Sequence, residues 1–331
     1  MLDILLFTVN SILPIILLIV LGYLLKLRGF FTPEFLKRGN KLVFYVCLPA
    51  LLFKNVFDIN SLSEIRLDVL AYCLILIAIM LAIGAAMTLL IPDARQKGVI
   101  HQCVFRSNFA LIGVPLAELM GGDAGVRTAA ILALFSIPIY NMLAVVILTI
   151  YKDGKAKPDI KKVLKDICRN PLIIGTLLGF AAALLKMLLS NTGAAALLEP
   201  VSFPYTALSY VARAATPLSL FVLGGQFDFQ RIAGYRKQLT LGIAGRNFLA
   251  PLLGVGIAGV LTKMGILQFG PDVFATFIAF FGTPVAVASA IMAEAMDNDG
   301  QLAGQLVVWT SLISIFSLFI IIFLTRACGL L

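Results

Sequence analysis

The chain has 331 residues, of which 60% are hydrophobic and 13% are charged, and its formal net charge is +9. An ordinary soluble domain carries roughly 25% charged residues, so this composition excludes one and predicts an all-α polytopic membrane protein. The basic residues lie in short segments between apolar runs, which favours a signal for membrane topology over binding of nucleic acid.

Ten apolar runs predict ten transmembrane helices, because about 20 residues cross the hydrocarbon core of a bilayer. In chain order they cover 4–25, 41–57, 68–91, 99–119, 127–151, 170–189, 205–227, 239–262, 271–295 and 302–326. The polar segment 152–169 separates the fifth run from the sixth. We therefore expect one five-helix unit in residues 1–151, a linker in 152–169, and a second unit in 170–331.

Lysine and arginine concentrate in alternate connections. The first, third, fifth and seventh connections hold most of the 26 basic residues. Basic connections stay on the cytoplasmic side of a membrane, so these four connections, the linker included, are predicted to be cytoplasmic. Both termini are then predicted to lie outside the cytoplasm, in a multi-pass protein of the cell membrane.

The two halves repeat several features in the same order. The spacing from Pro14 to Gly22 equals that from Pro171 to Gly179, and the sequence around Pro49, CLPALLF, resembles ATPLSLF around Pro217. Five helices in each half is an odd number, so the second copy crosses the membrane with the opposite orientation. The sequence thus predicts an inverted repeat, an architecture common among secondary carriers.

Proline interrupts one span in each half. The fourth span contains Gly113-Val-Pro115, and the ninth contains Thr283-Pro284. A proline removes a backbone hydrogen bond, and the freed groups need protein or water as partners inside a bilayer. Two interrupted spans in corresponding positions predict two broken helices that cross near the middle of the membrane at a ligand site.

Each interruption is expected to begin a half-helix whose N-terminus points to the crossing. Unpaired N–H groups there favour an anion. Asn108 would offer an amide donor to a carboxylate, and Ser107 and Thr283 would offer hydroxyls; the competing interpretation is that they only join neighbouring helices. The candidate substrate-binding residues are Arg106, Ser107, Asn108, Gly113, Pro115, Gln226, Arg246, Thr283 and Pro284.

Charged residues within spans are costly and are candidates for function. Arg106 would hold an anion or extend to the lipid headgroups, and the same two readings apply to Arg246. Glu118 would take part in proton coupling or only complement a helix dipole. Sodium could instead use carbonyl groups at the breaks. The sequence offers no paired acid and base groups and no cluster of metal ligands, so we predict no enzyme, no cofactor and no metal site.

The motif Asn108-FALI-Gly113-Val-Pro115-Leu116, together with the LPALLF and PLSLFVLGG runs, resembles the auxin efflux carrier family, whose bacterial members include malate and malonate permeases. The resemblance covers essentially the whole chain. It implies a bile-acid-symporter-like fold, in which spans one, two, six and seven form a scaffold that often dimerises. Spans three to five and eight to ten would then form a transport domain that moves as an elevator.

The resemblance also implies roles for single residues. Asn108 would contact the substrate carboxylate, and Pro115 and Pro284 would be the crossover prolines. The chain lacks the long central loop of the plant members and has Gly225-Gln226 where they carry an asparagine. These differences favour a small bacterial-type carboxylate over auxin.

The sequence therefore predicts a secondary active transporter of a small organic anion, either malate-like or malonate-like or an auxin-like acid, coupled to a proton, to sodium or to neither. A membrane sensor that binds the anion without net transport is the alternative. The absence of a soluble signalling domain favours the carrier.

Overall fold

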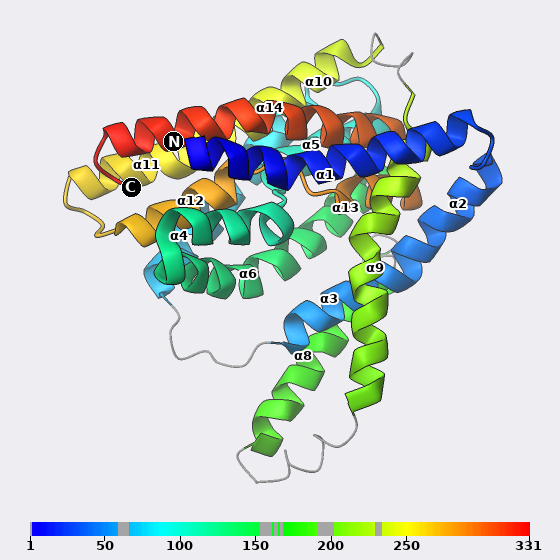
Figure 1. The fold of residues 1–331 in the computed structure, drawn as a ribbon, viewed down its shortest axis with the longest axis horizontal. Coiled ribbons are helices and arrows are strands. Elements are labelled where there is room, and N and C mark those ends of the chain that lie inside the picture. The colour runs from blue at the N-terminus through cyan, green and yellow to red at the C-terminus, as the bar shows by residue number, and fades with distance from the viewer. Residues whose placement is uncertain are drawn as a thin grey trace.

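The computed structural model describes residues 2–58, 66–152, 161, 165, 168–190, 202–228 and 234–331, and these residues form helices joined by short connections (Figure 1). The predicted central linker lies largely outside the described residues. The α-helices are α1 (Leu2–Leu27), α2 (Pro33–Leu42), α3 (Leu48–Phe57), α4 (Leu67–Thr88), α5 (Ala94–Phe105), α6 (Val114–Lys152), α8 (Pro171–Ser190), α9 (Ser202–Gln226), α10 (Arg236–Ile243), α11 (Ala250–Lys263), α12 (Pro271–Gly282), α13 (Ala288–Ala295) and α14 (Gly300–Ala327).

Several of these helices match the dimensions of a bilayer. Within the described residues, six helical stretches are long and apolar enough to cross a membrane, and they cover Pro33–Phe57, Leu67–Thr88, Phe109–Lys152, Phe203–Gln226, Arg236–Lys263 and Gly300–Ala327. Three shorter apolar helices cover Leu13–Leu27, Pro171–Lys186 and Pro271–Gly282. The described chain is therefore all-helical and has the character of a multi-pass membrane protein.

Wide turns accommodate three of the prolines. The π-helical turns η1 (Val43–Cys47), η2 (Phe109–Gly113) and η5 (Ala244–Leu249) end two residues before Pro49, Pro115 and Pro251 respectively. A proline ring clashes with the carbonyl group four residues earlier and cannot donate to it. A π turn shifts that carbonyl out of the normal α-helical register, so the helix continues through each proline.

The first interruption therefore does not lie where Pro115 predicted it. Helix α5 ends at Phe105, residues 106–108 are not helical, and helical structure resumes at Phe109. Pro115 lies inside the resumed helix because η2 removes the clash. The predicted position, Gly113–Pro115, was wrong by several residues. In the second half, α12 ends at Gly282 and α13 begins at Ala288, so residues 283–287 separate them.

A sharp bend at Gly122 divides α6 into two arms. Gly122 has φ 58° and ψ −150°, a backbone conformation that glycine adopts readily and side chains resist. Helix α6 packs along α12 and α5. This bend separates the two apolar runs that the sequence placed at 99–119 and 127–151.

The helices pack in two groups. In the first group α3 packs against α8 and α9, and α9 packs against α1. Helices α3, α8 and α9 extend away from the remaining helices in Figure 1. The second group contains α4, α5, α6 and α10 to α14. The groups meet where α1 contacts α14, where α9 contacts α13, and where α3 and α8 contact α6.

Glycines bring backbones of the first group close together. A Cβ atom on Gly224 of α9 would overlap the carbonyl oxygen of Ile19 in α1, and one on Gly22 would overlap the carbonyl oxygen of Phe221. Gly175 and Gly179 of α8 pack in the same way on the backbone of α3. Small residues allow such close approach of helices in membranes, where packing replaces the hydrophobic effect as the driving force.

We predict that Gly224→Ala lowers the free energy of unfolding by about 1–3 kcal/mol, because the added methyl group has no room and α1 must shift. Gly256→Ala in α11 is the matched control, since its Cβ would meet only the Leu252 side chain at 3.9 Å. Thermal unfolding of the purified protein in detergent measures both variants. Equal melting temperatures for the two would contradict the close packing of α1 on α9.

Candidate functional site

Two non-helical segments, one from each half of the chain, lie side by side. Ser107 and Val285 form an isolated antiparallel β-bridge, and the Asn108 N–H donates to the Pro284 carbonyl group at 2.7 Å. The bridge joins the segment after α5 to the segment after α12. We call residues 106–108 together with 283–287 the crossing.

A helix begins directly after each of the two segments of the crossing. Asn108 is the N-terminal cap of η2, and its side chain makes no capping hydrogen bond. The other segment leads into α13 at Ala288. The first N–H groups of a helix have no partner within that helix and carry partial positive charge. The start of η2 therefore presents hydrogen-bond donors near the crossing, whereas the Ser289 and Ala290 N–H groups of α13 already donate to the carbonyl groups of Ala286 and Val287.

A cavity of about 100 Å³ lies at the crossing, between the two groups of helices. Its lining comes from α3, the crossing, η2, the second arm of α6, α9 and the start of α13. The polar residues that line it are Asn55, Arg106, Ser107, Asn108, Tyr140, Asn141, Thr216 and Ser219. Leucines of α3 and Leu111 supply apolar surface, so the cavity combines apolar walls with polar groups on the crossing.

Arg106 places a positive charge at this cavity. Its side chain is 3% exposed, and its guanidinium donates to Asn141 Oδ1 at 2.6 Å and to Met292 Sδ at 2.8 Å. Among the described residues, no carboxylate lies within ion-pair distance of it. The guanidinium is buried, so Arg106 does not extend to the lipid headgroups.

Asn108 adds a free donor. The side chain is 7% exposed, and its Nδ2 atom has no hydrogen-bond partner among the described residues. The hydroxyl groups of Ser107 and Tyr140 are neighbours in the same cavity. A carboxylate ligand would thus find a charged donor, an amide donor and hydroxyl groups together.

The other candidates from the fourth and ninth spans do not line the cavity. Gly113 packs against the ring of Phe109, and Pro115 is exposed on η2–α6. The Thr283 hydroxyl donates to the Ala279 carbonyl at 3.0 Å, which satisfies the end of α12. Pro284 acts through its carbonyl group, which accepts from Asn108.

Two further candidates also lie elsewhere. Gln226 ends α9, and its carbonyl group accepts a hydrogen bond from Gln301 Nε2 at 2.8 Å. Arg246 is 1% exposed and donates to backbone carbonyls of α5 and α12, so it too stays away from the headgroups. Glu118 is exposed on the first arm of α6.

Sequence reasoning missed five polar residues of the lining, which are Asn55, Tyr140, Asn141, Thr216 and Ser219. Asn141 stands in an apolar run, and a polar amide within a predicted span is itself a signal of function. Asn55 and Thr216 lie within a few residues of the repeated prolines Pro49 and Pro217. Only packing shows that these residues face the crossing.

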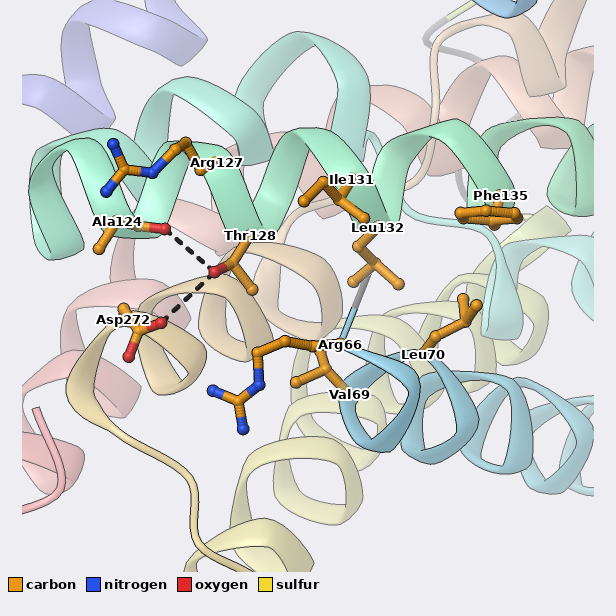
Figure 2. Close-up of a pocket in the computed structure, with 10 residues that line it drawn as sticks. All are labelled: Arg66, Val69, Leu70, Ala124, Arg127, Thr128, Ile131, Leu132, Phe135 and Asp272. Carbon is orange, nitrogen blue, oxygen red and sulfur yellow. Dashed lines mark hydrogen bonds between the residues drawn. The ribbon is translucent and has the colours of Figure 1, made fainter. Parts of the chain in front are cut away.

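A second cavity, of about 230 Å³, lies between the starts of α4 and α12 and the second arm of α6 (Figure 2). Asp272 lies between Arg66 and Arg127 in this view. The Thr128 hydroxyl contacts the Asp272 carboxylate at 3.4 Å, and Arg66 pairs with Asp68 at 2.6 Å. Carboxylates offset the positive charge here, so the crossing is the stronger candidate for an anion site.

We predict that Asn141→Leu lowers the free energy of unfolding by about 1.5–3 kcal/mol, because it removes the only oxygen that accepts from the buried Arg106 guanidinium among the described residues. Asn55→Leu is the matched control, because Asn55 lines the same cavity from α3 and no hydrogen bond to Arg106 is lost. Thermal melts of both variants measure the difference. A melt of Asn141→Leu that matches the control would show that Arg106 does not depend on this amide.

Comparison with known proteins identifies the family of this chain. The family described as membrane transport protein matches residues 7–322. An uncharacterized transporter of Methanothermobacter thermautotrophicus is 22% identical over 93% of this chain and 95% of its own length. A protein of Rhizobium meliloti named "Putative malonate transporter" is 24% identical over 73% of each chain.

A further relative, an uncharacterized transporter of Methanocaldococcus jannaschii, is 25% identical over 65% of this chain and 67% of its own length. The family match spans nearly all of the sequence, including both segments of the crossing. The chain belongs to the membrane transport protein family, that of the auxin efflux carriers, and is a transporter rather than an enzyme.

Proposed function

We propose that this transporter is a secondary carrier of a small organic anion and that the cavity at the crossing is its binding site. The single observation that carries the proposal is the Arg106 guanidinium, which is buried beside the cavity without a carboxylate partner in the described chain. An uncompensated charge inside a membrane protein is costly. An anionic substrate would supply the missing negative charge.

The donors at the crossing favour a carboxylate. Arg106 would bind it with charge-assisted hydrogen bonds, and Asn108 Nδ2 and the N–H groups at the start of η2 would bind its remaining oxygens. We expect this carboxylate to belong to a compact acid such as malonate or malate. The name of the Rhizobium meliloti relative supports the same class of substrate.

We infer that the transport mechanism is of the elevator type. The grouping of α1, α3, α8 and α9 on one side and α4, α5, α6 and α10 to α14 on the other supports a scaffold and a moving domain. The cavity lies between the groups, so relative movement would expose it to each side in turn. Ten spans in two inverted repeats, with the fourth and ninth broken at the crossing, are the architecture that this mechanism needs.

A homodimer formed through the scaffold, termini outside the cytoplasm and a place in the cell membrane complete the proposal. The glycine-mediated packing of α1 on α9 and of α3 on α8 supports a rigid scaffold. A sensor that binds the same anion without flux remains the alternative, and transport measurements separate the two.

The test is counterflow in proteoliposomes with radiolabelled malonate, malate or indole-acetate. We expect accumulation of a small dicarboxylate. Arg106→Gln should weaken its apparent affinity by about 10- to 100-fold, because a hydrogen bond to a charged group is worth about 1.5–3 kcal/mol. Asn108→Ala should weaken it by a smaller factor, since a neutral amide donor is lost.

Arg127→Gln is the matched control, because it removes an exposed arginine from the second cavity. Binding of a dicarboxylate without counterflow would favour the sensor. If Arg106→Gln binds the dicarboxylate with unchanged affinity, the Arg106 charge is not the basis of recognition. If Asn108→Ala binds it with unchanged affinity, Asn108 does not contact the substrate.

A further inference from the structure

The Arg246 guanidinium lies where helices α5 and α12 both end. Its Nη1 atom donates to the carbonyl groups of Val104 and Phe105, at 3.3 Å each, and its Nη2 atom donates to the carbonyl group of Phe281. The side chain is 1% exposed. One cation therefore joins the C-terminal ends of two helices that belong to different halves of the chain.

Two helix ends of this kind form a site for a cation. The last carbonyl groups of a helix have no partner within it and carry partial negative charge, so a cation near them is stabilising. In carriers built from discontinuous helices, such ends and the neighbouring unwound carbonyls coordinate sodium or protons. Here the carbonyls of Val104, Phe105 and Phe281 already accept hydrogen bonds from Arg246.

The position of Arg246 is built into the fold. It lies in the wide turn η5, two residues after the turn begins. The next residue, Asn247, donates to the Thr310 carbonyl of α14 at 2.9 Å, and the Thr310 hydroxyl accepts from the Val285 N–H at 3.3 Å. The turn η5 is thus connected to the crossing by hydrogen bonds through Thr310 of α14 as well as by those of the Arg246 guanidinium.

We propose that Arg246 is the resident cation of the crossing, which takes the place of a coupling sodium ion at the ends of α5 and α12. The inference rests on the proposed function and concerns the ion requirement of that carrier. A guanidinium stays protonated at every physiological pH, so its charge neither leaves nor needs replacement during transport. Transport of the organic anion is therefore independent of sodium.

The two buried arginines, Arg106 and Arg246, then have different roles at the crossing. Arg246 neutralises the C-terminal ends of α5 and α12, whereas Arg106 and the helix starts after the crossing face the cavity. Arg246 does not line that cavity, so it acts as a positioning residue and not as a substrate ligand.

The test compares the wild type, Arg246→Ala, Arg246→Lys and Arg236→Ala in sodium, choline and guanidinium chloride. Arg236 is the matched control, since it is exposed and lies ten residues earlier in the same continuous helix. In the wild type, the melting temperature and malonate counterflow should be the same in 100 mM sodium and in 100 mM choline. Arg246→Ala should lower the melting temperature by roughly 5–10 °C relative to Arg236→Ala.

Chemical rescue tests whether the vacated position binds a free cation. About 10 mM guanidinium should raise the melting temperature of Arg246→Ala and leave the wild type unchanged, because the free ion can occupy the site that the side chain vacated. Arg246→Lys should retain sodium-independent behaviour with a smaller loss of stability. A failure of guanidinium to stabilise Arg246→Ala would overturn the inference.

Sodium-dependent counterflow or sodium-dependent stability of the wild type would also overturn it, while leaving the carrier proposal in place. No dicarboxylate binding or counterflow in any salt would instead contradict the proposed function. In that case the melting temperatures in the three salts still decide whether Arg246 fills the cation position.

Discussion

The structure depends on a short contact between two segments that are almost 180 residues apart in the sequence. The bridge between Ser107 and Val285, and the hydrogen bond from Asn108 to Pro284, satisfy backbone groups that would otherwise be unpaired inside the bilayer. Each non-helical segment therefore depends on the other for its backbone hydrogen bonds. This mutual requirement fixes how the two halves meet, and the cavity, the buried arginines and the helix ends all lie around it.

The direction of the helices determines where partial positive and partial negative charge lie at this contact. Helices α5 and α12 end at the crossing, and their negative ends are joined by Arg246. The helices that follow begin there, and their positive ends lie near Arg106 and the unpaired amide of Asn108. Positive charge is thus balanced by the protein on one side of the contact and left uncompensated on the side of the cavity.

Prolines shape the helices without always interrupting them. Pro49, Pro115 and Pro251 each follow a π-helical turn and remain inside helical structure. Pro284 lies within the non-helical segment, where its carbonyl group accepts from Asn108. The same residue type therefore has two outcomes, because a helix either continues through the proline or ends before it. That depends on the packing of neighbouring helices, which a local sequence motif does not contain.

The sequence by itself determined the class of protein, an all-helical multi-pass membrane protein of a transporter family, because hydrophobicity and helix propensity act locally. Only the tertiary structure decided that the chain is interrupted at 106–108 and not at Pro115, and that Arg246 holds helix ends while Arg106 faces a cavity. It also brought Tyr140 and Asn141 to that cavity. These features depend on contacts between distant residues, and a side chain's surroundings follow from which helices pack against it.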